Sequence, residues 1–166
     1  MKRRATPIPH CVGLVGLGLM GCAFARRLVA AGWQVVGFDL SPACRRRAKR
    51  LGVRIARSNA AVFRACDRVL LSLPTLRETE LVLREVAAVL RPGQLILDTT
   101  TGEPEQAEAI YHRLATRGVR YLDATISGNS EQVADGDDVL MMVGGDAVAF
   151  AAARRLLRVL TPQVRH

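Results

Sequence analysis

The stretch Gly16-Leu17-Gly18-Leu19-Met20-Gly21 is a G-x-G-x-x-G loop that separates two segments of different hydrophobic periodicity. The preceding run, Val12-Gly13-Leu14-Val15, is continuously apolar, as in a buried strand, and the alanine-rich residues 22–31 that follow are typical of a helix. Segments in this order form a diphosphate site, because the free N–H groups and the dipole at the helix N-terminus attract an anion. The first glycine permits the tight turn, the second lets the phosphates approach the backbone, and the third lets helix and strand pack closely.

An acidic residue is expected about 20 residues beyond such a loop, where it accepts hydrogen bonds from an adenosine ribose. Asp39 takes that place, directly after the run Val35-Val36-Gly37-Phe38. Its charge favours NAD, because it would repel the 2′-phosphate of NADP. Arg45, Arg46 and Arg47 follow on the next predicted helix. They could reach a phosphate or form a solvated helix face, so NADP stays open as a second cofactor. The alternative to a cofactor site is a glycine-rich turn beside a routine surface aspartate.

The alternation of strand and helix patterns continues along the chain. Strands are predicted at 12–17, 34–39, 54–56, 68–73, 95–99, 119–123 and 139–143, and helices at 20–31, 42–51, 60–66, 76–90, 103–116 and 146–160. This order is typical of a Rossmann-type α/β fold, a doubly wound, mainly parallel sheet with helices on both faces. We expect one such domain over residues 11–166, preceded by a flexible basic arm at residues 1–10.

Composition narrows the class of partner. The 166 residues carry a formal net charge of +9, which suggests an anionic partner. Aromatic residues make up 4%, few for the stacking platforms that bind single-stranded nucleic acid, so we expect a phosphorylated cofactor. A nucleic-acid-associated protein that uses its arginines stays open as a rival function, and it predicts binding that weakens steeply with salt. No segment other than the glycine-interrupted run at 5–25 approaches membrane-spanning length, and we expect no membrane partner.

The four cysteines follow no metal-binding pattern. Cys11, Cys22, Cys44 and Cys66 contain no C-x-x-C pair and have no histidine at ligand spacing. We therefore expect no metal site, and we interpret the four as reduced core thiols of a cytoplasmic protein.

Three further motifs stand at the ends of predicted strands, in the order Leu73-Pro74-Thr75, Asp98-Thr99-Thr100-Thr101 and Asp123-Ala124-Thr125-Ile126-Ser127-Gly128-Asn129. With the glycine loop they resemble the G-L-G-x-M-G, L-P, D-S-S-T and D-A-P-V-S-G-G motifs of the β-hydroxyacid dehydrogenases. That family includes 3-hydroxyisobutyrate dehydrogenase and 6-phosphogluconate dehydrogenase. The resemblance spans nearly the whole chain, and Met141-Met142-Val143-Gly144-Gly145 is similar to a further family motif, F-M-V-G-G.

The resemblance implies hydride transfer between a nicotinamide and a β-hydroxyacid or a related small carbonyl or carboxylate substrate. It assigns the cofactor to Gly16, Gly18, Leu19, Met20, Gly21, Asp39, Leu73, Pro74, Thr75 and Thr101, and a substrate carboxylate to Ser127, Gly128 and Asn129. Two positions depart from the family, because Thr125 replaces a proline and Asn129 a glycine. From the residues alone, these threonines and Ser127 could instead serve β-propensity, turns or a helix cap.

The family's proton-transferring lysine lies in a G-x-x-x-K-x-x-x-N motif of a following helical domain. Neither Lys2, in the arm, nor Lys49, on the adenosine side, stands where it could replace that lysine. We therefore expect no catalytic residue in this chain, no activity without the C-terminal helical domain, and a homodimer only where that domain is present. The alternative function is a non-catalytic dinucleotide-binding or protein-interaction module.

Overall fold

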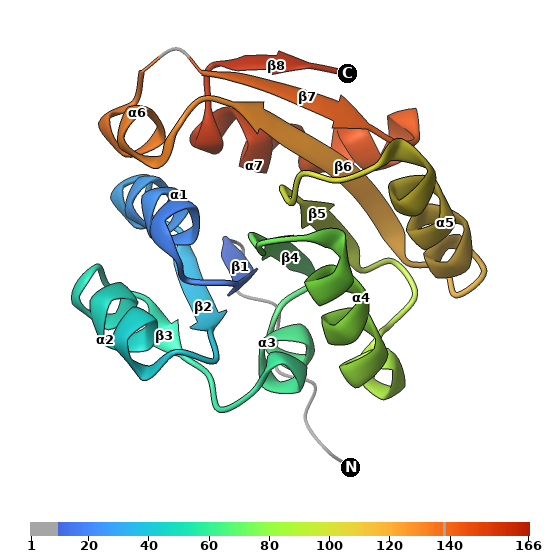
Figure 1. Cartoon of the computed structure of the whole chain (residues 1–166), viewed down its shortest axis with the longest axis horizontal. Helices are drawn as coiled ribbons and strands as arrows, with labels where there is room; N and C mark the ends of the chain where they lie inside the picture. The colour runs from blue at the N-terminus through green and yellow to red at the C-terminus, as the bar shows by residue number, and fades with distance from the viewer. Residues whose placement is uncertain (1–9, 138) are drawn as a thin grey trace.

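A computed structural model describes residues 10–137 and 139–166. Its eight-stranded sheet has the order β3-β2-β1-β4-β5-β6-β7-β8 (Figure 1). The strands are β1 (Cys11–Val15), β2 (Gln34–Phe38), β3 (Arg54–Ile55), β4 (Arg68–Leu71), β5 (Leu95–Asp98), β6 (Arg120–Ser127), β7 (Leu140–Gly144) and β8 (Gln163–Arg165). Every neighbouring pair is parallel except β6 and β7. The predicted Rossmann-type, mainly parallel fold is therefore confirmed.

Helices cover both faces of the sheet (Figure 1). They are α1 (Leu19–Ala30), α2 (Pro42–Arg50), α3 (Asn59–Ala65), α4 (Leu76–Glu85), α5 (Pro104–Ala115), α6 (Ser130–Asp135) and α7 (Ala147–Leu160), with a 3₁₀ turn, η1 (Ala87–Val89). One buried cluster joins the sheet to α1 and α7, and a second joins it to α3, α4 and α5. Two separate apolar layers thus hold the sheet between its helices.

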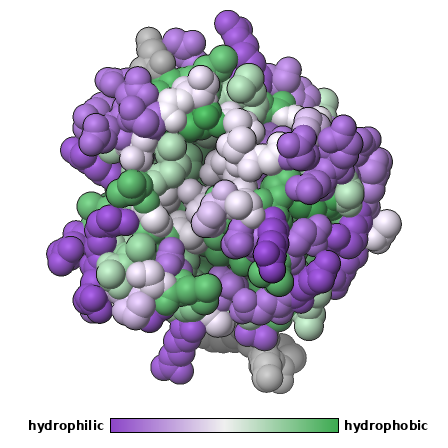
Figure 2. All heavy atoms as spheres, viewed as in Figure 1, coloured by the Kyte–Doolittle hydropathy of each residue, from purple (hydrophilic) through white to green (hydrophobic). Residues whose placement is uncertain are grey.

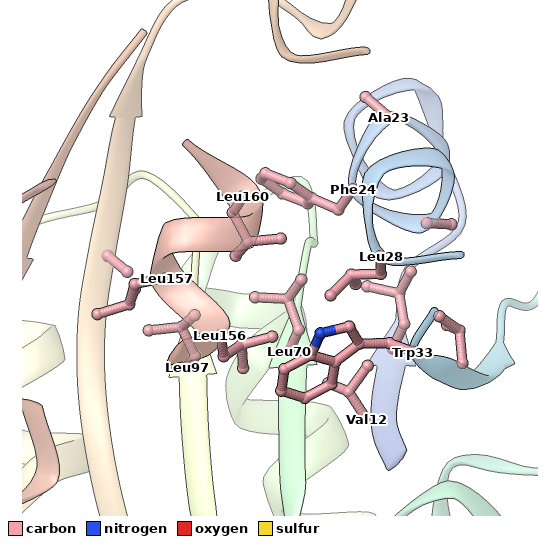
Figure 3. Packing of buried hydrophobic residues seen from close by; sticks show 14 of the residues in the cluster. Val12, Ala23, Phe24, Leu28, Trp33, Leu70, Leu97, Leu156, Leu157 and Leu160 are labelled. Atoms are coloured by element: carbon pink, nitrogen blue, oxygen red, sulfur yellow. The ribbon is translucent and has the colours of Figure 1, made fainter. Parts of the chain in front are cut away.

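The packing of α1 against α7 fixes the position of the helix that follows the glycine loop. Figure 3 shows Phe24 and Leu28 of α1 facing Leu156 and Leu160 of α7. All four side chains are fully or almost fully buried. Because α1 is anchored along this seam, its N-terminus has a fixed position at the end of β1.

Four elements differ most from the sequence-based prediction: β6, α6, β8 and α4. Strand β6 continues to Ser127 instead of ending at Asp123, because it pairs with β7 in an antiparallel ladder. The short α6 and β8 were missed, since six and three residues carry too little periodicity. The helix predicted over 76–90 stops at Glu85, and the chain tightens into η1 before the turn at Pro92.

The predicted arm at residues 1–10 lies outside the described residues apart from His10. The carbonyl of His10 accepts a hydrogen bond from the Gln34 N–H at 2.9 Å, which extends the β1–β2 ladder by one residue. Within the part of the chain that the structure describes, no helix is long and apolar enough to cross a membrane.

Candidate functional site

A cleft of about 450 Å³ opens at the carboxyl ends of β1, β2 and β4. The glycine loop, residues 38–40, residues 72–74 and one side of α4 line it. Figure 2 shows a hollow near the middle of this face, with apolar and neutral residues around it and hydrophilic ones at the rim. Ligands of open α/β sheets bind at such strand ends, where the strand order reverses, and here that point lies between β1 and β4.

Two glycines of the loop are required by the geometry of the turn. Gly16 has φ +89°, and a Cβ there would lie 2.0 Å from the carbonyl oxygen of Ser72. A Cβ on Gly21 would lie 2.0 Å from the carbonyl oxygen of Gly16. The first glycine therefore permits the turn, and the third lets α1 approach β1.

Gly18, the second glycine, faces open space. A Cβ at this position would meet nothing within 4 Å. Gly18 is also the N-cap of α1, where no side chain caps the helix and the first turn contains no acidic residue. The N-terminus of α1 is thus open to an external anion, with room for that anion at Gly18.

Asp39 follows β2 and lies beside the glycine loop. Its Oδ2 accepts a hydrogen bond from the Leu17 N–H at 2.7 Å, and its Oδ1 accepts one from the Ser41 N–H at 2.7 Å. A carboxylate offers about four acceptor positions, so each oxygen keeps one for a ligand hydroxyl. Asp39 therefore fixes the loop and still has capacity for a ribose.

The arginines after Asp39 are not uniformly solvated. Arg45 donates to the carbonyls of Asp39 and Leu40 at 2.6 and 2.9 Å, and its guanidinium lies 5.6 Å from the centre of the Phe38 ring. Arg47 donates to the Leu17 carbonyl at 3.4 Å. The alternative of a solvated helix face is therefore wrong for these two side chains, whereas Arg46 is exposed.

The motif after β4 divides between the cleft and the next helix. Leu73 and Pro74 line the cleft, and the Leu73 N–H donates to the Thr100 hydroxyl at 3.3 Å. Thr75 does not line the cleft. Its hydroxyl caps α4 by accepting from the Arg77 N–H at 3.2 Å, and it also hydrogen-bonds the Glu78 carboxylate. The structure therefore explains Thr75 as a helix cap.

A smaller cavity of about 220 Å³ adjoins the cleft. It shares Met20, Ser72, Leu73 and Pro74 with the cleft, so the two spaces meet beside these residues. Its other lining residues are Phe24, Thr99, Thr101, Ile126 and Gly128. The structure thus brings Thr101 and Gly128, from two separate motifs, to one small space at the end of the cleft.

Ser127 and Asn129 flank Gly128 without lining that cavity. Both are exposed, and Asn129 is the N-cap of α6. The Asn129 Oδ1 accepts from the N–H groups of Glu131 and Gln132 at 3.0 Å each, while its own N–H donates to the Gln132 side chain. A substrate carboxylate at the Asn129 N–H would have to replace this last bond.

The D-T-T-T motif contains a buried polar network. Asp98 is fully buried and accepts from the Thr100 N–H and the Tyr121 hydroxyl, both at 3.0 Å. Burial raises the pKa of the Asp98 carboxyl, and the hydrogen bond from Thr100 opposes that rise. Thr99 donates to the Leu71 carbonyl at 2.8 Å. Asp98, Thr99 and Thr100 therefore hold the strand ends in place, and Thr99 and Thr101 of the motif line the small cavity.

Sequence reasoning missed one wall of the cleft. Asn59 is 4% exposed and lines it, with its Nδ2 donating to Glu85 at 2.8 Å and its Oδ1 left without a partner. Leu19, Leu40 and Leu81 also line the cleft and are 71%, 84% and 55% exposed. No spacing rule links these residues. Leu40 could have been noticed in the sequence, because it directly follows Asp39.

The glycine turn, the acid after β2 and the switch point of the sheet coincide in one cleft, which defines a dinucleotide-binding domain of the Rossmann type. The chain belongs to the family described as the NAD binding domain of 6-phosphogluconate dehydrogenase, whose model matches residues 11–166.

Dehydrogenases of known function and structure support this assignment. The chain is 35% identical over 156 residues to L-threonate dehydrogenase of Cupriavidus necator, covering 92% of this chain and 52% of that protein. The NAD-dependent L-serine dehydrogenase of Pseudomonas aeruginosa is 33% identical over 158 residues, covering 93% and 53%. The structure of Mycobacterium tuberculosis 3-hydroxyisobutyrate dehydrogenase with L-serine matches with a TM-score of 0.91 at 30% identity, covering 96% and 54%.

These comparisons confirm the resemblance to the β-hydroxyacid dehydrogenases and the expectation of an NAD-binding domain. The chain spans about half the length of the curated relatives it matches.

Proposed function

We propose that this chain holds NAD in an extended pose across the cleft and presents the nicotinamide at the small cavity, as the cofactor half of a β-hydroxyacid dehydrogenase. The observation that carries the proposal is the uncapped N-terminus of α1 beside Gly18, where the protein leaves free N–H groups and open space together. In this pose the diphosphate lies over the loop from Gly16 to Gly21, and the Asp39 carboxylate accepts hydrogen bonds from the adenosine ribose.

The far wall of the cleft has the chemistry of an adenine site. Leu40 and Leu81 expose apolar surface that a flat base would cover. The buried Asn59 Oδ1 lacks a donor, and the exocyclic amine of adenine is a donor of the right kind. We place the adenine between these leucines, with its amine directed at Asn59.

At the other end, Leu73, Pro74, Met20 and Thr101 surround the nicotinamide, where NAD supplies the hydride chemistry. Gly128 and the neighbouring Ser127 lie beside the same space, so a small hydroxyacid carboxylate would bind there. Two of the relatives are named L-threonate dehydrogenase and L-serine dehydrogenase, and this supports a small polar acid as the substrate class.

Proton transfer needs a group from outside this site. None of His10, His112 and His166 lines the cleft or the small cavity. Lys49 lies on α2, away from Thr101 and Gly128. We therefore propose that a helical domain like that of the family supplies the acid–base group, and that a homodimer forms only through that domain.

The proposal is tested by titrating the purified chain with NADH and, separately, with NADPH, following nicotinamide fluorescence. Asp39→Ala should weaken NADH binding roughly 10- to 100-fold, because hydrogen bonds to a charged group contribute about 1.5–3 kcal/mol. Asp135→Ala, which removes an exposed carboxylate on α6, should leave the NADH affinity unchanged. Equal weakening by the two variants, or no saturable binding of either cofactor, would contradict this function.

A further inference from the structure

Two cysteine side chains meet at the amino ends of the strands, at the opposite end of the sheet from the cleft. The Sγ atoms of Cys11 and Cys66 lie 3.1 Å apart, although the residues are 55 positions apart in sequence. Cys11 is the first residue of β1, and Cys66 is the C-cap that follows α3 just before β4. Gly13 lies opposite Val69 in the parallel β1–β4 pair, so the residues that precede these two come together at the amino ends of the strands.

We propose that Cys11 and Cys66 form a redox-active dithiol that a hydroperoxide converts to an intramolecular disulfide. The two sulfurs need about 1 Å of further approach to reach the disulfide bond length of ~2.05 Å. The pairing of β1 with β4 positions Cys11, and the end of α3 positions Cys66. The two sulfurs are therefore adjacent in the folded chain before any oxidation.

The two thiols are suited to different parts of the reaction. Cys11 is half-buried, so a small oxidant can reach it, whereas Cys66 is 1% exposed. The hydrogen bond from Cys66 lowers the pKa of the Cys11 thiol to about 7, and the positive charge of Arg54 acts in the same direction. Cys11 is therefore the nucleophile, because the thiolate is the reactive form, and Cys66 is the resolving thiol.

The chemistry balances in two steps. The Cys11 thiolate attacks the O–O bond of the hydroperoxide, takes one oxygen as a sulfenic acid, and releases an alcohol or water after proton uptake. The Cys66 sulfur then attacks the Cys11 sulfur, the S–O bond breaks, and water leaves with the Cys66 proton. The dithiol loses two electrons and the hydroperoxide gains them.

The other two cysteines provide the internal control. Cys22 is buried and donates to the Leu17 carbonyl at 3.3 Å, and Cys44 lies beside Arg47. Neither is hydrogen-bonded to another sulfur within the described residues. Because Cys11 and Cys66 lie at the amino ends of the strands, their reaction does not depend on the cofactor site, and the two proposals can fail separately.

The test is to treat the reduced chain with hydrogen peroxide, block the remaining thiols, and map the products by mass spectrometry. A mass loss of about 2 Da and a peptide linked through residues 11 and 66 are expected, and dithiothreitol should reverse both. Cys11 and Cys22 share the tryptic peptide at 5–26, so the Cys22→Ser variant should give the same link without ambiguity. Cys44→Ser should also keep it, and Cys11→Ser should abolish it.

A thermal melt gives a second readout on the wild-type chain. Closing so long a loop should raise the melting temperature of the oxidised form above that of the reduced form. Oxygen added to Cys11 with no link, a link through Cys22 or Cys44, a dimer joined between chains, or no reaction would each overturn the proposal.

Discussion

Asn59 is a buried polar residue whose Oδ1 has no hydrogen-bond partner. If adenine supplies the donor, Asn59→Ala should weaken NADH binding about 3- to 10-fold, because one neutral hydrogen bond contributes roughly 0.5–1.5 kcal/mol. Reduced nicotinamide mononucleotide lacks adenine, so its affinity should not change in the variant. Fluorescence titrations of both ligands check this, and an equal loss for the two would place the effect of Asn59 outside an adenine contact.

Asp98 makes a pH-dependent contribution to stability. Burial raises its folded-state pKa above the unfolded value, so the folded form resists ionisation. Its contribution is fully present below the unfolded pKa and is lost as the pH rises through the folded pKa. The free energy of unfolding of the wild type, minus that of Asp98→Asn, should therefore fall as the pH rises through the range above about 4, the ordinary pKa of an aspartate. Urea denaturation across that range measures the difference, and a difference that grows with pH would refute the assignment.

Substitutions in the glycine loop should separate the free energy of unfolding from the affinity for NADH. A methyl group at Gly18 meets open space, so Gly18→Ala should change the free energy of unfolding by about 1 kcal/mol or less. The same methyl group should weaken NADH binding at least 10-fold, because it takes the room of the diphosphate. Gly21→Ala is the matched comparison, since its methyl group would lie 2.0 Å from the Gly16 carbonyl oxygen. This variant should be several kcal/mol less stable. Unchanged NADH affinity in a folded Gly18→Ala chain would exclude the diphosphate from this position.

Elements with strong periodicity were predictable from the sequence, and those that depend on distant partners were not. Strands β1, β2, β4 and β5 are short apolar runs buried between helices, and they lie where the pattern indicates. The extension of β6 to Ser127 depends on an antiparallel ladder with β7, which no local pattern reveals. The helix α6 depends on the reciprocal bonds of Asn129 and Gln132, a capping box that was interpreted only as part of a substrate motif.

In the candidate site, too, the residues with a fixed local spacing were predictable and those brought together by the fold were not. The glycine loop and Asp39 were predictable, because the diphosphate and the ribose require fixed residue types at fixed spacing. The far wall of the cleft was not, since Asn59 and Leu81 come from α3 and α4 and meet only in the folded chain. The resemblance assigns Thr75 and Asn129 to ligands, which stays a prediction, and it does not reveal that their side chains cap α4 and α6.

At the scale of the whole molecule, the sheet brings the ends of five strands, β1, β2, β4, β5 and β6, to one continuous space. The cleft holds the glycine loop and Asp39, and the small cavity holds Thr101 and Gly128. The two meet at Met20 and residues 72–74, which gives a path from Asn59 and Leu81 to Gly128. In the pose proposed above, an extended dinucleotide would follow this path, with its nicotinamide beside Gly128.

A crystal structure of the chain with NADH tests this account most directly. We predict the diphosphate within hydrogen-bonding distance of the first N–H groups of α1 beside Gly18, the adenine amine at the Asn59 Oδ1, and the nicotinamide beside Thr101. A dinucleotide bound elsewhere, or one lying in the reverse direction with its nicotinamide at Asn59, would contradict the account.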